Sequence, residues 1–195
     1  MQAWYASDLG LEALQLETEE VLGDATLIAM YAYWTRIKGG NEIPLRRDLD
    51  PTEIGPKLLP YSLLTDVDTQ LRTVRHRVVG TNFTDFFGSD ITGKELSSVL
   101  SGNYLEFILG LYMLVCERRL PVAAHSKFQW DQGRLLKASR LMVPLSKDGS
   151  RADMCYTCQV FETSEGPDAP QVFIAAADGW EDVSGRFSHL SVDPI

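Results

Sequence analysis

The sequence predicts an α+β domain built on one antiparallel sheet of five strands, with helices inserted between the second and third strands. Apolar and polar residues alternate in strand-like segments at 61–68 and 72–80, and three further strands are expected at 122–130, 135–145 and 153–161. Short turn-like sequences join the neighbouring segments within each group. The stretch between the two groups has apolar residues three and four positions apart, which is the periodicity of a helix.

A helix is expected at residues 24–38, ahead of the sheet. Asp24 is a suitable N-cap, and Gly39 suits the helix end. Tyr31 and Trp34 belong to a broad aromatic face on this helix. Two interpretations are open: the face packs on the domain itself, or it forms the seam of a homodimer.

The chain then enters the sheet through a segment rich in proline. Pro44 keeps the backbone extended or turning. Asp50 followed by Pro51 predicts the cap and the first residue of a short helix, which Gly55-Pro56 and Pro60 bound before the first strand. Residues 68–70 are a plausible hairpin turn between the first two strands.

Two helices of different length are expected between the second and third strands. Phe83, Phe86 and Phe87 cluster in one or two helical turns that Gly88 ends. The stronger helix spans 103–119; its first residue, an asparagine, is a suitable N-cap. Its apolar stripe predicts that it covers one face of the sheet.

The formal charge of −9 is concentrated at the two ends of the chain. Residues 1–22 carry five acids and no base, residues 162–195 carry seven acids and one base, and the remainder is +2. The chain is therefore expected to have three parts: an acidic N-terminal extension at 1–23, a folded domain at 24–162, and an acidic C-terminal extension at 163–195 in which 171–177 has the pattern of one edge strand.

Composition also bears on compartment and partners. The chain has three cysteines and no secretory signal, which is typical of a reduced compartment, so a cytoplasmic protein is expected. No apolar stretch reaches the roughly 20 residues of a membrane span. The acidic balance and the lack of nucleic-acid motifs argue against nucleic acid and anionic membranes as partners.

The order of the elements and a set of short motifs point to a known family. The motifs are Trp34-Thr35-Arg36, the entry segment Ile43-Pro44-Leu45-Arg46-Arg47-Asp48-Leu49-Asp50-Pro51, Leu58-Leu59-Pro60, Arg77-Val78-Val79-Gly80-Thr81 and Thr92-Gly93-Lys94. Together they resemble a bacterial PAS subfamily formerly described as a domain of unknown function. The resemblance covers about 24–162, with His76 standing where an aromatic residue is expected.

The resemblance implies a fold and a function. PAS domains sense small ligands or mediate protein contacts, and usually regulate a separate output. Residues 163–195 are too few and too polar for an output domain, so a stand-alone regulatory module in signal transduction is expected. It would bind a small, mainly apolar ligand, a regulatory protein partner, or both. The first alternative is a protein-interaction scaffold with a filled core and no ligand, and the second is an enzyme.

A ligand cavity in such a domain would lie between the inserted helices and the sheet. The candidate lining residues are aromatic or aliphatic, together with one arginine: Arg77, Phe83, Phe87, Tyr104, Phe107, Leu111, Phe128, Trp130, Leu141 and Tyr156. Packing as ordinary core is the competing interpretation for each apolar member. A buried Arg77 would need an acceptor, either a carboxylate such as Asp85 or Glu106 or the carboxylate of a ligand.

Candidate interaction residues lie in the first helix and the entry segment. They are Tyr31 and Trp34, for the aromatic seam, and Arg46 and Arg47, which form a basic patch with Arg36 and Lys38. The patch is either a solvated face, a partner of the acidic N-terminal segment, or a surface for an anionic protein. The acidic extensions correspondingly either shield this patch or meet a basic partner.

Metal, cofactor and catalytic sites are not predicted. Cys155 and Cys158 have C-x-x-C spacing, but in a strand they point to opposite faces, so two buried cysteines are expected. The helix 103–119 has no histidine for haem, and 81–88 has no cysteine for flavin photochemistry. The sequence has no nucleophile elbow and no glycine-rich phosphate loop.

Overall fold

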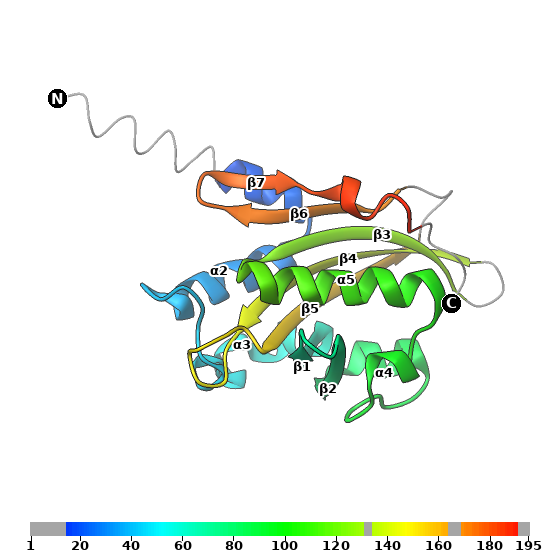
Figure 1. Cartoon of the computed structure of the whole chain (residues 1–195), viewed down its shortest axis with the longest axis horizontal. Helices are drawn as coiled ribbons and strands as arrows, with labels where there is room; N and C mark the ends of the chain where they lie inside the picture. Colours follow the sequence, from blue (N-terminus) through cyan, green and yellow to red (C-terminus); the bar gives the residue numbers. More distant parts are fainter. Residues whose placement is uncertain (1–14, 131–133, 164–168, 191–195) are drawn as a thin grey trace.

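The computed structural model describes residues 15–130, 134–163 and 169–190; at 128–130, 134–135 and 163 it describes the backbone alone. The described chain folds around a single sheet whose neighbouring strands are all antiparallel, in the order β2-β1-β5-β4-β3-β6-β7 (Figure 1). The strands are β1 Ser62–Asp68, β2 Thr73–Val79, β3 Val122–Trp130, β4 Arg134–Leu145, β5 Met154–Thr163, β6 Gln171–Ala176 and β7 Gly179–Asp182.

The expected number of five strands is wrong, because the C-terminal segment adds a hairpin. β6 pairs with β3, placing Val122 opposite Ile174, and β7 pairs with β6. The segment expected to add one edge strand forms β6, but β7 and not β6 lies at the edge of the sheet. β7 has four residues, too few to show an alternation, so this part of the chain was expected to be a tail. The hairpin makes β3 an interior strand.

One face of the sheet is covered by helix α2 (Ala25–Lys38) and by α3 (Pro51–Leu58). Asp24 caps α2 by accepting hydrogen bonds from the backbone nitrogens of Thr26 and Leu27, and Asp50 caps α3. The indole Nε1 of Trp34 donates to the carbonyl oxygen of Pro144 in β4 at 2.9 Å. The aromatic face of α2 therefore packs on the domain, as the first interpretation of this helix predicts.

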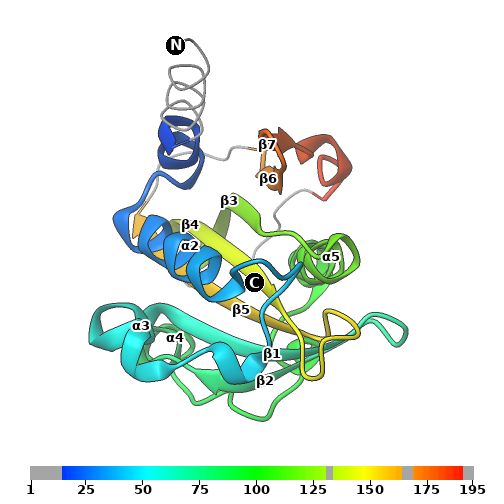
Figure 2. The ribbon, with the colours of Figure 1, turned by 90° about the vertical axis from the view of Figure 1, so that its left-hand side faces the viewer.

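The opposite face is covered by α5 (Gly102–Arg118), with α4 (Thr81–Phe87) and a 3₁₀ turn at Leu96–Ser98 beside it. Figure 2 shows α2 and α5 on the two sides of the central strands β4 and β5. α5 begins at Gly102, so its N-cap is Ser101, two residues before the expected cap Asn103. Two cores result, one under each set of helices, and the central strands contribute to both.

The helical segment at 15–22 docks against β7. The backbone nitrogen of Trp180 donates to Glu17 Oε1 at 3.0 Å, and the indole Nε1 of Trp180 donates to the Thr18 hydroxyl at 3.1 Å. The ring of Tyr31 lies 5.4 Å from the Trp180 ring, between centroids. Segments from the two acidic ends of the chain are thus packed side by side. Within the described ranges, no helix combines the length and apolar character that crossing a membrane requires.

Candidate ligand cavity

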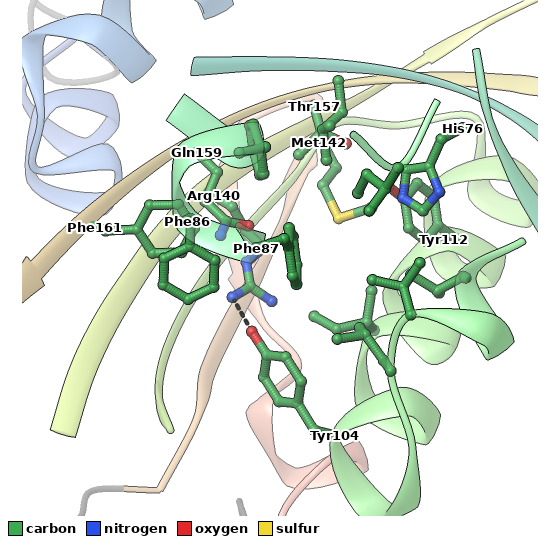
Figure 3. A pocket seen from close by; sticks show the side chains of 17 residues that line it. His76, Phe86, Phe87, Tyr104, Tyr112, Arg140, Met142, Thr157, Gln159 and Phe161 are labelled. Carbon is green, nitrogen blue, oxygen red and sulfur yellow. Dashed lines mark hydrogen bonds between the residues drawn. The ribbon is translucent and has the colours of Figure 1, made fainter. Parts of the chain in front are cut away.

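A cavity of about 50 Å³ lies between α4, α5 and the adjoining face of the sheet (Figure 3). A water molecule needs about 10–15 Å³ of such space, so the cavity exceeds the needs of one water. Its walls come from elements far apart in the sequence, among them β2, α4, α5, β4 and β5. Apolar side chains make up most of the lining, which is the composition usual for small-molecule sites.

Aromatic rings close the side of the cavity next to α4. Phe86 stacks on Phe161 of β5 with centroids 4.3 Å apart and planes at 7°, and Phe87 meets Phe86 edge-on at 5.1 Å. Phe83 is fully buried, whereas Phe86 and Phe87 are half-buried. Gly88, in the left-handed conformation with φ of 66°, ends α4 directly after them. This short helix therefore supplies one wall of the cavity.

The lining also includes a buried cation. Arg140 of β4 is 1% exposed, and its Nη2 donates to the Tyr104 hydroxyl at 3.0 Å and to the Ser126 hydroxyl at 3.1 Å. The guanidinium also lies over the rings of Tyr104 and Phe107, at 5.9 and 5.7 Å from their centroids. Figure 3 shows it pointing toward Tyr104. Its Nε and Nη1 are buried and have no hydrogen-bond partner.

A buried histidine and a buried tyrosine add polar groups to the lining. The Nδ1 of His76 lies 3.0 Å from the Lys94 carbonyl oxygen. Burial lowers the pKa of His76 below its ordinary 6.5, and the bond to Lys94 opposes that shift. Burial raises the pKa of Tyr112 far above 10, while its hydrogen bonds with Thr157 and Thr65 act in the other direction. At neutral pH both groups are uncharged, so Arg140 supplies the charge.

The residues expected to line a cavity fall into several groups. Phe83, Phe87 and Tyr104 line it, whereas Phe107 and Leu111 are buried in the core around it. The side chains of Phe128 and Trp130 lie outside the described part of the structure.

Leu141 and Tyr156 were expected to line the cavity, and this is wrong, because both side chains lie on the opposite face of the sheet. They belong to the core under α2, where the Tyr156 hydroxyl donates to the Ser62 hydroxyl at 2.6 Å. Their neighbours Arg140 and Thr157 point into the cavity instead. Successive side chains in a strand point to opposite faces, and both faces of β4 and β5 are buried here. Hydrophobicity therefore gave no signal that separates the two faces.

The expectation that Arg77 lines the cavity is also wrong. Its side chain is 56% exposed, and its Nε pairs with Asp66 Oδ2 at 3.0 Å on the outer side of β2. The acceptor is a carboxylate, as one interpretation predicts, but it is neither Asp85 nor Glu106. The strand alternation explains this position: His76, one residue earlier, takes the inward place.

The cavity residues that sequence reasoning missed are chiefly Arg140 and His76. Arg140 shares its face of β4 with Ala138 and Met142, which are buried beneath α5. An arginine at an inward position of a central strand is rare, because a buried charge needs a partner. An arginine at an inward strand position would have indicated the site, but that position can be recognised only when it is known which face of β4 lies under α5.

The expected interaction residues are mostly engaged within the domain. Trp34 is 3% exposed, because its ring lies between α2 and the sheet. It is therefore not available for the expected dimer seam. Tyr31 packs on Trp180, and Arg46 donates through Nη1 to the Leu49 carbonyl oxygen at 3.2 Å. Arg47 is exposed.

The cysteines are buried and free of disulfides. Cys155 lies in the core under α5 and Cys158 in the core under α2, as the strand periodicity predicts. Burial raises the pKa of Cys116 and of Cys158 to about 12, so both are thiols at neutral pH. Within the described ranges, no group of three His, Cys, Asp or Glu side chains converges in a way that could hold a metal ion.

Comparison with known proteins identifies the family of this fold. No curated protein sequence matches the chain. A solved structure of the VqmA dimer of Vibrio cholerae, a LuxR-type receptor, aligns with a TM-score of 0.44 and 12% identity; the alignment covers 70% of this chain and 61% of that one. The model of the PAS domain family matches residues 23–157, which include the cavity-lining segments of α4 and α5 and the inward positions of β4. The chain therefore belongs to the PAS domain family.

Proposed function

We propose that this protein acts as a sensory module that binds a small, mainly apolar molecule in the cavity between α4, α5 and the sheet. The observation that supports it is the cavity itself, which is lined mainly by apolar side chains and contains one buried charge. Natural cores are close-packed, with few voids larger than a water molecule. A cavity with a charged group inside is more simply explained as a binding site than as a packing defect.

The position of the cavity suggests how ligand binding would change the surface of the protein. α4 forms one wall through Phe86 and Phe87, and both rings are half-buried at the boundary with solvent. A molecule that fills the cavity contacts these rings and shifts α4 toward whichever arrangement holds it best. A regulatory protein that contacts α4 would then detect the change. We propose that the protein acts in this way as a regulator in the cytoplasm and not as an enzyme.

We propose in addition that the protein forms a homodimer and contacts a regulatory protein partner. A seam away from Trp34 fits the burial of that side chain, which is 3% exposed. Sedimentation at several protein concentrations tests the homodimer. A mass equal to one chain at every concentration would reject it.

The ligand-binding function is tested by identifying what the protein carries when it is purified without denaturation. Native mass spectrometry of the full chain, followed by denaturation and analysis of released small molecules, is the experiment. The expected result is one small molecule released in a fixed ratio to protein. Release of none, combined with no response to any molecule in a binding screen, favours the alternative of an interaction scaffold.

A further inference from the structure

The buried guanidinium of Arg140 offers more hydrogen-bond donors than the protein uses. An arginine side chain carries five N–H groups. Nη2 makes two hydrogen bonds, to Tyr104 and Ser126, while the N–H groups of Nε and Nη1 have no partner although both atoms are buried. An unpaired buried donor costs free energy, and the cost is greater when the group is charged.

The charge of Arg140 is likewise unbalanced. Among the described residues, no Asp or Glu side chain lies within 4.0 Å of the guanidinium. Its two hydrogen-bond acceptors are neutral hydroxyls, and the rings of Tyr104 and Phe107 add weak attraction through their π faces. Buried charges in proteins are normally paired with an opposite charge. The missing partner is therefore an anion.

Size and lining restrict that anion further. Arg140 is the one Arg or Lys among the described lining residues, so a single negative charge balances it. The remaining lining is mostly apolar and includes Phe83, Phe87 and Met142. A volume of about 50 Å³ leaves room for few non-hydrogen atoms. A strongly hydrated or multiply charged anion such as phosphate would leave most of its oxygens against apolar side chains.

We infer that the cavity binds a small carboxylic acid with a short apolar chain, whose carboxylate is held by the unpaired N–H groups of Arg140 and whose chain lies against the α4 aromatic rings. This inference rests on the proposed ligand-binding function and specifies the chemistry of the ligand. Arginine pairs with carboxylates in strong, charge-assisted hydrogen bonds. The competing occupant is water, which would satisfy the donors without neutralising the charge.

The test compares acids with their amides, which have nearly the same shape but no charge. Thermal unfolding of the full chain is followed in sodium propionate or sodium butyrate, and in propionamide or butyramide at the same concentrations. Sodium chloride keeps the ionic strength constant. The expected result is a rise in Tm of about 2–4 °C at acid concentrations a few times Kd, with a much smaller shift for the amide.

Two arginines of the same sheet provide a matched pair of variants. Arg140→Met removes the buried charge but keeps a long apolar side chain, and the response to the acid is expected to disappear. Arg77→Met makes the same change at an exposed arginine outside the cavity and is expected to keep the full response. If Arg140→Met does not fold, Arg140→Lys keeps the charge but loses the planar donor set, and its affinity for the acid is expected to fall about tenfold or more.

The outcomes separate this inference from the proposed function. Equal stabilisation by acid and amide, or an undiminished response in Arg140→Met, overturns the inference that Arg140 binds a carboxylate. Release of a neutral ligand from purified protein also overturns it but leaves the ligand-binding function standing. If neither acids nor amides stabilise the protein and nothing is released on denaturation, both fail and the cavity holds water.

Discussion

The Nη2 atom of Arg140 lies 3.0 Å from the hydroxyl oxygen of Tyr104. This contact joins the middle of β4 to the first turns of α5, across the cavity. It also fixes the orientation of the guanidinium, since the second hydrogen bond of the same nitrogen goes to Ser126 of β3. The two hydroxyls hold the cation from one side, and the nitrogens without partners are Nε and Nη1.

Tyr104→Phe should destabilise the protein by about 1–2 kcal/mol, because a buried charged donor loses an acceptor. Urea unfolding followed by circular dichroism measures the change. The same substitution in an Arg140→Met background is the control and should cost far less, since no guanidinium remains to be satisfied. An equal cost in both backgrounds would show that the hydroxyl stabilises the fold through a group other than Arg140.

Trp34→Phe should cost about 1–3 kcal/mol of the free energy of unfolding. The change removes the hydrogen bond to the Pro144 carbonyl and leaves space between α2 and the sheet. Trp180→Phe is the matched control at a half-buried tryptophan, and its cost should be below about 1 kcal/mol. A Trp34→Phe protein of unchanged stability but altered mass in sedimentation would instead place Trp34 in an interface between chains.

The protein should lose stability as the pH falls below about 6.5. Burial lowers the pKa of His76 and of His125 from 6.5, so the unfolded chain binds more protons than the folded one in this range. The stabilisation is fully present above pH 6.5 and decreases until the pH passes the folded-state values. Urea unfolding at intervals from pH 8 to pH 5 measures it.

Single variants identify which histidine is responsible for this pH dependence. His76→Gln and His125→Gln should each flatten the dependence of stability on pH, because each removes one proton-binding group. His189→Gln, at an exposed histidine, is the control and should leave the slope unchanged. An unchanged slope in both buried variants would mean that carboxyl groups, not histidines, govern the acid response.

Gly80→Ala should destabilise the junction between β2 and α4. A Cβ at Gly80 would overlap the backbone carbonyl oxygens of Leu59 and Pro60, which cannot rotate away as a side chain can. The expected cost is about 1–3 kcal/mol. Gly40→Ala, where no atom lies within 4 Å of the added Cβ, should change stability by less than about 0.5 kcal/mol. Equal stability of the two variants would show that the junction tolerates movement.

Several elements were predictable because their causes are local. Asp24 and Asp50 cap helices at the expected positions, and Gly88 ends α4 with a positive φ. A cap depends on side chains within three residues of the helix end, so the residues that form it can be recognised from the sequence alone. The alternation in β1 and β2 was visible for the same reason. The family resemblance rested on the order of these elements, and the PAS family model covers them.

The content of the cavity was predictable only in part. Phe83, Phe87 and Tyr104 line it, but the charged lining residue expected from the sequence was Arg77, whereas the structure has Arg140 there. Each arginine lies in a strand between one polar and one apolar residue, so its immediate neighbours do not show which of the two is buried. The difference is that β4 lies in the middle of the sheet beneath α5, whereas Arg77 lies on the outer side of β2, which ends the sheet.

The sequence by itself determined the fold class, the positions of most helices and strands, and the acidic character of both ends of the chain. The tertiary structure decided which face of each central strand borders the cavity, how β6 and β7 extend the sheet, and which arginine is buried without a counter-charge. The physical reason is range: caps, turns and periodicity act over a few residues, whereas burial depends on strands and helices brought together from distant parts of the chain.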